Sequence, residues 1–291
     1  MSDRSSPRTA FVLAGGGSLG AVEVGMLQAL VEGGIRADLV VGASVGAVNG
    51  AFFAGRPDLE GVRALRAIWE GLRARSVFPF SPIGNLLGVL ALRDHIVDPG
   101  PFQRLVARHL PYRALEDARV PIHVVATNLL NGRQTVLSRG PAAPAVLASA
   151  AIPGVFPPVR IGGDFLFDGG VASNTPIAAA IELGAERIIV LPTGYSCEMK
   201  RPPTSALAMA LHGLNLMIAR QLVVDVERFM DRTQIRVIPP LCPLVTQPFD
   251  FSEATELITR AAKGTRDWLR GGGLEHPGIP HELPPHTHDV I

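Results

Sequence analysis

The chain has 291 residues, 47% of them hydrophobic, and its 27 basic and 26 acidic side chains leave a net charge of +1 at pH 7. This length and composition suit one domain with a large aliphatic core, and the near-neutral charge excludes a strong positive field that would recruit nucleic acid. The two cysteines, Cys197 and Cys242, lack metal-ligand spacing and are too few for a disulfide scaffold, which indicates reduced thiols, no metal site and a cytoplasmic protein.

The sequence predicts neither a targeting segment nor a membrane span. The opening residues are polar and are not followed by an apolar stretch with a cleavage site. Several uncharged windows approach the length of a span, but each is interrupted by glycine, proline, asparagine or histidine. We therefore expect these windows to form core or an apolar surface near a site.

The first fifty residues carry a β-α-β-α pattern. Residues 9–14 are a predicted buried strand that runs into the glycine-rich loop 15–20 (Gly-Gly-Gly-Ser-Leu-Gly), and an apolar helix pattern continues to Gly33. A second predicted strand covers residues 38–41. The crossover requires the two strands to be parallel, so the loop after each strand opens at the carboxyl edge of the sheet. The glycine-rich loop and Ser44 are therefore expected to lie side by side.

A Gly-Ala-Ser-Val-Gly sequence follows the second predicted strand and leads into small, helix-compatible residues. In this context a Gly-x-Ser-x-Gly turn is typical of a nucleophile elbow, because Gly42 and Gly46 lack the Cβ atoms that would otherwise collide. The hydroxyl of Ser44 is then exposed at the end of the strand. The following helix directs its N–H groups and its positive dipole end at that hydroxyl, which favours an anion there. The alternative is a plain turn between a buried strand and a helix.

The middle of the chain predicts a helix of structural role over residues 58–73, and then an uncharged segment over residues 78–90 that we interpret as a cap or a wall of the site. The elements predicted next are a helix over 100–110, a hairpin of strands at 120–127 and 134–137, an alanine-rich helix over 142–150, an apolar loop to residue 158, and a strand over 165–167 that ends in Asp168-Gly169-Gly170.

The last third of the chain returns to alternating strands and helices. Asn174 is expected to cap a helix that begins with Pro176 at its first position. The remaining predicted elements are a strand over 187–191, a helix over 204–230, a strand over 235–238 and an amphipathic helix over 252–269. Residues from 271 onward are rich in glycine, proline and histidine and are expected to be a loose tail.

The loop pattern Gly15-x-Gly17-x-x-Gly20 between a strand and a helix also fits the fingerprint of a dinucleotide-binding site, which would indicate an oxidoreductase. That site needs an acidic residue at the far end of the second strand, whereas Asp38 begins that strand, and this difference argues against the nucleotide. Beside a serine nucleophile, a glycine loop has another use, because its unobstructed backbone N–H groups can form an oxyanion hole. Gly16, Gly17 and Ser18 are the expected donors, with Val45 as an additional one.

A serine nucleophile needs a base, and no histidine is well placed to supply it. His212 lies in a helical pattern, and His276, His281, His286 and His288 lie in the expected tail; His95, His109 and His123 fit surface or core roles better. Asp168 ends a predicted strand, and Gly169 and Gly170 after it allow close backbone approach. It can therefore reach the edge that carries Ser44, although Asp-Gly alone is also a common turn.

Four blocks of this sequence resemble, in order and spacing, the patatin-like phospholipase family. They are the glycine-rich loop 15–20, the elbow 42–46, the stretch 148–158 (Ala-Ser-Ala-Ala-Ile-Pro-Gly-Val-Phe-Pro-Pro), and Asp168-Gly169-Gly170 with Asn174 and Pro176. The resemblance covers about residues 9–191. It implies a lipid acyl hydrolase with Ser44 as nucleophile and Asp168 as base, and an oxyanion hole in the glycine loop, to which Gly15 is assigned with Gly16, Gly17 and Ser18. Leu19 departs from the family, many members of which have a basic residue there, and this difference concerns the headgroup preference.

We therefore expect a three-layer α/β/α sandwich with a mostly parallel central sheet, in one hydrolase domain over residues 9–270 between flexible termini (1–8 and 271–291). The expected reaction is hydrolysis of a lipid carboxylic ester through an acyl-enzyme, of the phospholipase A, lysophospholipase or carboxylesterase type, without metal or cofactor. The expected partner is a lipid or long-chain acyl ester at a membrane or micelle surface. The alternatives are an acyltransferase, a nucleotide-binding oxidoreductase and a lipid-binding module without catalysis.

Overall fold

A computed structural model of the protein describes residues 7–79, 95–194, 206–244 and 249–284. Its centre is a mixed eight-stranded sheet with the order β5-β6-β3-β2-β1-β7-β8, in which β4 pairs with β3. The strands are β1 (Thr9–Leu13), β2 (Leu39–Ala43), β3 (Ile122–Asn128), β4 (Gln134–Leu137), β5 (Val159–Ile161), β6 (Asp164–Asp168), β7 (Arg187–Leu191) and β8 (Gln234–Val237).

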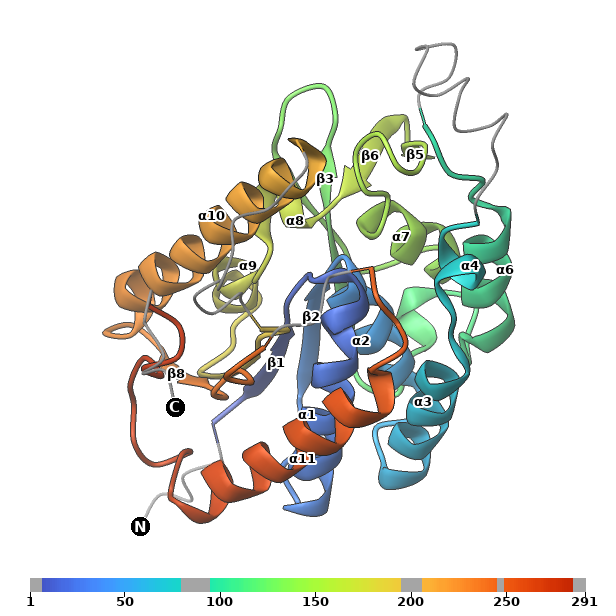
Figure 1. Cartoon of the computed structure of the whole chain (residues 1–291). Coiled ribbons are helices and arrows are strands. Elements are labelled where there is room, and N and C mark those ends of the chain that lie inside the picture. The colour runs from blue at the N-terminus through green and yellow to red at the C-terminus, as the bar shows by residue number, and fades with distance from the viewer. Residues whose placement is uncertain (1–6, 80–94, 195–205, 245–248, 285–291) are drawn as a thin grey trace.

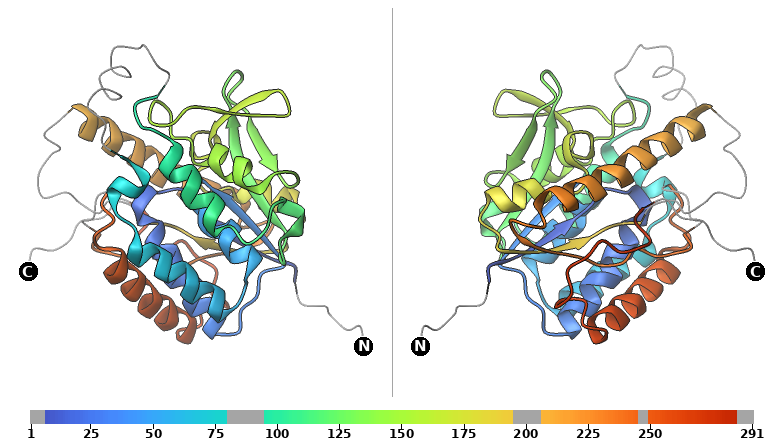
Figure 2. Two further views of the ribbon diagram at one scale, coloured as in Figure 1. Left: turned by 90° about the vertical axis from the view of Figure 1, so that its right-hand side faces the viewer. Right: turned by 90° about the vertical axis from the view of Figure 1, so that its left-hand side faces the viewer.

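Helices cover both faces of the sheet, as the two side views in Figure 2 show. The helices are η1 (Gly17–Gly20), α1 (Ala21–Glu32), α2 (Val45–Gly55), α3 (Leu59–Gly71), α4 (Ala74–Val77), α6 (Gly100–His109), η2 (Leu115–Asp117), α7 (Ala142–Ser149), α8 (Gly170–Ser173), α9 (Ile177–Glu182), α10 (Ala206–Phe229) and α11 (Ala254–Arg270). The expected three-layer α/β/α architecture is confirmed.

Strand β1 is the centre of the parallel part of the sheet. It is buried along its whole length and pairs in parallel with β2 on one side and β7 on the other. Because side chains alternate between the faces of a strand, Phe11 and Leu13 enter the core beneath α1 and α2, whereas Ala10 and Val12 enter the core beneath α9 and α10. The five parallel strands are β8, β7, β1, β2 and β3.

The remaining three strands are antiparallel and form the other end of the sheet. β6 runs antiparallel to β3, so that Asp168 lies opposite Ala126. The expected strand at 165–167 is therefore present, although it approaches the carboxyl edge from the opposite direction to β2. The sequence analysis missed β5, which pairs with β6, and the short helices α4 and α8.

Helix α1, like strand β1, lies inside the fold, and nine of its twelve residues are buried. It is buried on almost every side because α11 packs across its outer face. A Cβ atom at Gly25 would overlap the carbonyl oxygen of Ile258 in α11, so only glycine permits this approach. The contact joins helices from the two ends of the described chain.

Two expectations about the last part of the chain need revision. Pro176 precedes α9 as its N-cap residue, without a side-chain capping bond, and Asn174 has another role, described below. Residues 271–284, which composition suggested to be loose, contain hydrogen-bonded turns, and Leu283 is buried against the core beneath α10. Within the described residues, no helix combines the length and the apolar character that a bilayer span requires.

Candidate active site

Ser44 occupies a sharp turn between β2 and α2. Its backbone has φ 53° and ψ −126°, and among the described residues other than glycine it alone has a positive φ. A Cβ atom at Gly42 would overlap the backbone of Gly46, and one at Gly46 would overlap the carbonyl oxygen of Leu13. Two glycines are thus required for β2, β1 and the start of α2 to approach so closely, and the serine bears the strained conformation between them.

The hydroxyl of Ser44 donates a hydrogen bond to Asp168 Oδ2 over 2.7 Å. The other carboxylate oxygen, Oδ1, accepts the Gly170 N–H at 2.7 Å, and the Thr127 hydroxyl donates to the Asp168 carbonyl oxygen. A Cβ atom at Gly169 would overlap the Val125 carbonyl oxygen, so this turn also depends on glycine. These contacts fix the carboxylate in the direction of Ser44.

Both polar residues are almost enclosed by protein, since Ser44 is 8% exposed and Asp168 is 6% exposed. Burial raises the pKa of Asp168 to about 6, although the hydrogen bonds from Ser44 and Gly170 act in the opposite direction. The carboxyl group is therefore mostly ionised at neutral pH, but it is a stronger base than an exposed aspartate.

Within the glycine-rich loop, the residues assigned to an oxyanion hole are not equivalent. The Gly15 N–H donates to the Asn174 carbonyl oxygen at 3.0 Å, so the assignment of Gly15 as a donor was wrong. In the described part of the chain, the N–H groups of Gly16, Gly17 and Val45 have no protein partner. Gly17 and Val45 line the same pocket as Ser44, whereas Ser18 is buried and does not line that pocket.

Asn174 and Thr193 hold the glycine-rich loop at its start. Asn174 Nδ2 donates to the Gly15 carbonyl oxygen at 3.2 Å, and the Thr193 hydroxyl donates to the same oxygen at 2.8 Å. A Cβ atom at Gly16 would overlap the side chain of Thr193. Asn174 therefore joins β6 and α8 to the loop and does not cap α9. Its side chain bonds to the distant Gly15 carbonyl oxygen instead of to the backbone N–H groups at the start of α9.

Ser149, at the end of α7, holds Ser44 from the other side. Its hydroxyl accepts the Ser44 N–H at 2.9 Å and donates to the Val125 carbonyl oxygen at 2.5 Å. The alanine-rich helix and the elbow are thus joined directly.

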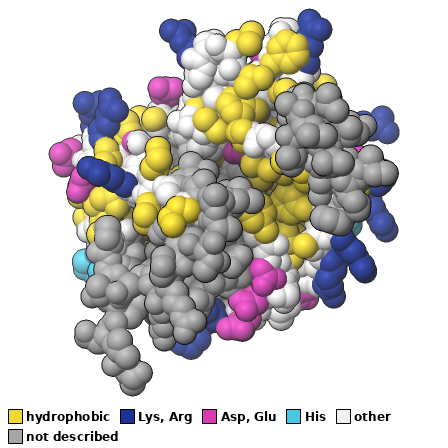
Figure 3. Space-filling view, turned by 45° about the horizontal axis from the view of Figure 1, so that its top comes forward, with side chains coloured by type: hydrophobic (Ala, Val, Ile, Leu, Met, Phe, Trp, Pro, Cys, Tyr) yellow, Lys and Arg dark blue, Asp and Glu magenta, His cyan; other side chains and the backbone are white. Residues whose placement is uncertain are grey.

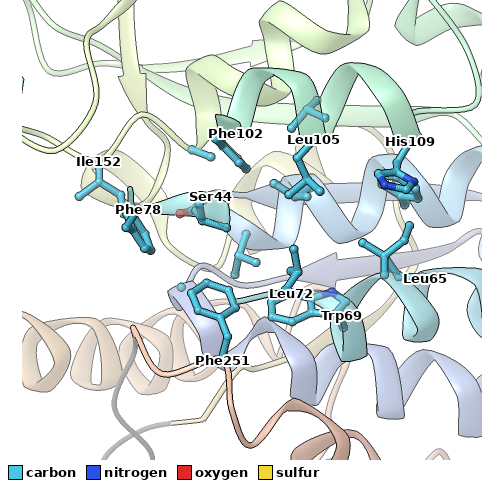
Figure 4. Close-up of a pocket in the computed structure, with 18 of the residues that line it drawn as sticks. Ser44, Leu65, Trp69, Leu72, Phe78, Phe102, Leu105, His109, Ile152 and Phe251 are labelled. Atoms are coloured by element: carbon cyan, nitrogen blue, oxygen red, sulfur yellow. The ribbon is translucent and has the colours of Figure 1, made fainter. Parts of the chain in front are cut away.

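A pocket of about 720 Å³, including volume open to solvent, extends from Ser44 (Figure 4). Its walls are almost entirely aliphatic and aromatic. They come from α2 (Val48 and Phe52), α3 (Leu65, Ile68 and Trp69), α6 (Phe102, Leu105, Val106 and His109) and the segments that carry Leu72, Val77, Phe78, Ala150, Ile152, Phe156 and Phe251.

The expected apolar wall is confirmed at Phe78 and at Phe156, whose rings stack with centroids 5.6 Å apart. Residues 80–90 of the predicted wall lie outside the described residues. Helix α3, expected to be only structural, is part of the wall, and the apolar stripe that contains Trp69 was the available signal. Phe251 was missed because only tertiary packing brings it here.

His123 and His276 have hydrogen-bond partners other than Ser44. His123 Nδ1 is hydrogen-bonded to Ser138 Oγ at 2.7 Å, and His276 Nδ1 to the Gly272 carbonyl oxygen at 2.9 Å. His109 lines the pocket, which the sequence analysis missed, but its ring lies at the opposite end from Ser44 (Figure 4). Burial and the nearby Arg108 lower the pKa of His109. Among the described residues there is no cluster of histidine, cysteine and carboxylate side chains that could hold a metal ion.

The face at the carboxyl edge of the sheet carries hydrophobic side chains with basic side chains at its margins (Figure 3). Leu130, at the turn between β3 and β4, is 79% exposed, and its neighbour Leu129 is 45% exposed. Phe165 in β6 is 42% exposed, and the guanidinium of Arg160 lies over its ring. These side chains are apolar but not part of the core.

Comparison with known proteins agrees with this geometry. An uncharacterized NTE family protein of Mycobacterium tuberculosis is 33% identical over 189 residues, which are 64% of this chain and 49% of that protein. Lysophospholipase NTE1 of Cryptococcus neoformans is 33% identical over 183 residues, which are 63% of this chain and 11% of that protein. The chain thus spans half or less of the length of these curated relatives.

A solved structure supports the fold. The crystal structure of VipD from Legionella pneumophila matches with a TM-score of 0.51 and 17% sequence identity, over 93% of this chain and 67% of that one. The model of the patatin-like phospholipase family matches residues 11–181, from β1 to α9. Because this match covers more than half of the sequence, the chain belongs to the patatin-like phospholipase family.

Proposed function

We propose that this protein is a serine hydrolase that cleaves carboxylic esters of lipids with a dyad of Ser44 and Asp168. The observation that carries the proposal is the 2.7 Å hydrogen bond from Ser44 Oγ to Asp168 Oδ2 inside a buried site. The family and its lysophospholipase relatives support a lipid substrate. The reaction is of the phospholipase A, lysophospholipase or carboxylesterase type.

In the first half of the reaction, Asp168 accepts the hydroxyl proton while Ser44 Oγ forms a bond to the ester carbonyl carbon. The bond from that carbon to the leaving alcohol then breaks, and the proton on Asp168 passes to the alcohol oxygen. In the second half, Asp168 accepts a proton from water as the water oxygen attacks the acyl-enzyme. The acid leaves, and the proton returns to Ser44 Oγ.

The oxyanion of each tetrahedral intermediate would be stabilised by the backbone N–H groups of Gly16, Gly17 and Val45. Each lies in the loop or helix start that borders Ser44. The dipole of α2 also points its positive end at this position. Such stabilisation is needed because a carboxylate is a weak base for a serine hydroxyl.

The apolar pocket would hold the acyl chain, since its walls offer hydrocarbon contacts from Ser44 to His109. The exposed side chains of Leu129, Leu130 and Phe165 would contact a micelle or membrane surface while the chain enters. The protein would therefore act on aggregated substrate as a peripheral enzyme.

The direct test is reaction with a fluorophosphonate, which phosphonylates an activated serine, together with hydrolysis of acyl esters of graded chain length. We expect labelling at Ser44, identified by mass spectrometry, and release of free acid. A folded protein that neither reacts with the probe nor hydrolyses any ester would contradict the proposal. A run with added alcohol shows whether water or an alcohol accepts the acyl group.

A further inference from the structure

A fully buried hydrogen-bond network lies behind the glycine-rich loop and is not used in the proposed chemistry. It joins Glu23 in α1, Asn49 in α2 and Trp69 in α3. Glu23 and Asn49 are 0% exposed and Trp69 is 4% exposed. Burial of a carboxyl and an amide is costly unless their hydrogen bonds are formed, so such a network indicates a specific role.

Asn49 is the centre of the network. Its Nδ2 donates to the Gly20 carbonyl oxygen at 2.9 Å and to Glu23 Oε2 at 2.7 Å, and its Oδ1 accepts the Trp69 indole N–H at 2.9 Å. Since the indole can only donate, these bonds determine which end of the amide is oxygen. Both amide hydrogens and the oxygen are used, which fixes the side chain in one orientation.

Glu23 accepts a hydrogen bond from Asn49 at its Oε2 atom. Burial raises its pKa well above the ordinary value, although the hydrogen bond from Asn49 acts in the opposite direction. Its second oxygen, Oε1, has no hydrogen-bond partner among the described residues. A glutamine has nearly the same shape as a glutamate and keeps one side-chain oxygen, so it can accept the same hydrogen bond from Asn49.

Gly20 connects this network to the catalytic loop. It ends the short helix η1, which begins at Gly17 beside Ser44. A Cβ atom at Gly20 would overlap Val45 and closely approach Asn49 Nδ2. The loop is therefore held at its start by Asn174 and Thr193 and at its end by Asn49. Trp69 belongs to the pocket wall, where its ring stacks on Phe251 with centroids 6.0 Å apart.

We propose that Asn49, held by Glu23, is a positioning residue that fixes the glycine-rich loop relative to Ser44 and to the acyl-pocket wall at Trp69. This inference rests on the proposed function, because the loop is proposed to bind the oxyanion. Loss of the network lets the loop amides move from the oxyanion position. Turnover and phosphonylation of Ser44 then slow, whereas ground-state binding of the acyl chain changes little.

The first test compares two replacements of Glu23 that have similar size. Glu23→Met removes the acceptor and leaves an amide hydrogen of Asn49 unpaired, so we expect kcat and the rate of phosphonylation to fall about tenfold with KM within about twofold. Glu23→Gln keeps the acceptor and should retain both rates within about threefold. Equal rates in the two variants, whether both are lowered or neither is, would overturn the proposal.

A second test does not depend on Glu23→Met folding. Trp69→Phe removes the indole N–H but keeps a ring against Phe251, and its reaction is measured with a short and a long-chain fluorophosphonate. We expect both probes to react about fivefold more slowly. Slower reaction of the long-chain probe alone, or of neither, would overturn the proposal, since Trp69 would then act at most through contact with the chain. Absence of labelling in the wild type would overturn the proposed function itself.

Discussion

The backbone N–H of Ser44 is bonded to the hydroxyl of Ser149, 2.9 Å away, and that hydroxyl in turn donates to the Val125 carbonyl oxygen. The amide of Ser44 is therefore not available to the proposed oxyanion hole, and this leaves Val45 and the glycine-rich loop as its proposed donors. Ser149 also joins α7 to the elbow and to β3. The turn at Ser44 is thus held by a side chain from a distant part of the sequence.

Ser149→Ala should weaken both stability and activity. It leaves the Ser44 N–H and the Val125 carbonyl oxygen without their partner in a buried position, which costs about 2 kcal/mol of unfolding free energy. We expect kcat to fall about tenfold as the elbow loosens. Urea unfolding and ester hydrolysis measure the two effects. The control is Ser138→Ala, which removes a serine hydroxyl just after β4 that is bonded to His123 and not to the turn at Ser44. Unchanged values for both would contradict a structural role for Ser149.

Ser44→Ala and Ser44→Gly should both abolish labelling and lower hydrolysis at least about a thousandfold, because the nucleophile is absent. They should differ in stability. Glycine adopts a positive φ without the steric cost that alanine pays, so we expect Ser44→Gly to be more stable by about 1 kcal/mol. Thermal unfolding of the two inactive variants measures this strain. Residual turnover near the wild-type level in either variant would contradict the assignment of the nucleophile.

Activity should increase with pH through the pKa of Asp168. The base must be ionised, and burial raises its pKa to about 6. We therefore expect kcat/KM to be about tenfold lower at pH 5 than on the plateau above pH 7. A profile measured with a soluble, short-chain ester excludes effects of substrate aggregation. A rate that stays flat from pH 5 to pH 8 would contradict aspartate as the base.

Asp168→Asn should be inactive but more stable at neutral pH. The folded protein binds the Asp168 proton more tightly than the unfolded chain does, because the pKa changes from 3.8 to about 6. The stability that this carboxyl contributes is complete below about pH 4 and is lost as the pH rises through 6, a change of about 3 kcal/mol. The asparagine in this variant has no proton to lose, so the unfolding free energy of the variant lacks this pH dependence. The variant should therefore become more stable than the wild type as the pH rises from about 4 through 6, as measured by urea unfolding. An advantage that is independent of pH would contradict this account.

His109→Ala should keep turnover within about tenfold and shift the preferred acyl chain to greater length. The imidazole lies at the end of the pocket opposite Ser44, so its removal lengthens the cavity without affecting the dyad. The ratio of kcat/KM between long and short acyl esters measures the shift. His123→Ala and His276→Ala, outside the pocket, are controls that should keep the wild-type ratio. Loss of all turnover in one folded histidine variant would replace the dyad with a triad.

Leu130→Asp should lower hydrolysis of phospholipid vesicles about tenfold and leave hydrolysis of a soluble short-chain ester unchanged. The side chain is 79% exposed, so its replacement has little effect on stability. The control is Met230→Asp, which changes an exposed apolar side chain just after α10. That end of α10 lies away from the β3–β4 hairpin (Figure 1). Equal activity of the two variants on vesicles, together with no flotation of the wild type on liposomes, would contradict docking through this hairpin.

The sequence was most informative where local backbone chemistry determines structure. The spacing of Gly42, Ser44 and Gly46 between a strand and a helix indicated the sharp turn, because a Cβ atom at either glycine would overlap neighbouring backbone. The first β-α-β-α unit could be predicted for a similar reason, since a short crossover permits only parallel strands. The prediction that Asp168 reaches Ser44 agrees with their hydrogen bond.

Long-range packing was the main source of error. Asn174 was expected to cap a helix, because capping is its usual local role, but the approach of the glycine-rich loop offers it the Gly15 carbonyl oxygen. The same close approach lets the Gly15 N–H donate to the Asn174 carbonyl oxygen, so it does not point to the proposed oxyanion position. The pocket wall formed by Trp69, Phe102 and Phe251 could not be read from any one segment, since these residues meet only after α3, α6 and the segment before α11 pack together.

The close contact between Gly25 of α1 and Ile258 of α11 has a consequence for synthesis of the protein. A ribosome releases α1 long before α11, so the apolar outer face of α1 has no cover until α11 emerges. Early β-α units can form, but their core cannot close during most of translation. Nascent chains that end before α11 should therefore be protease-sensitive, and native packing around α1 should begin only when α11 docks.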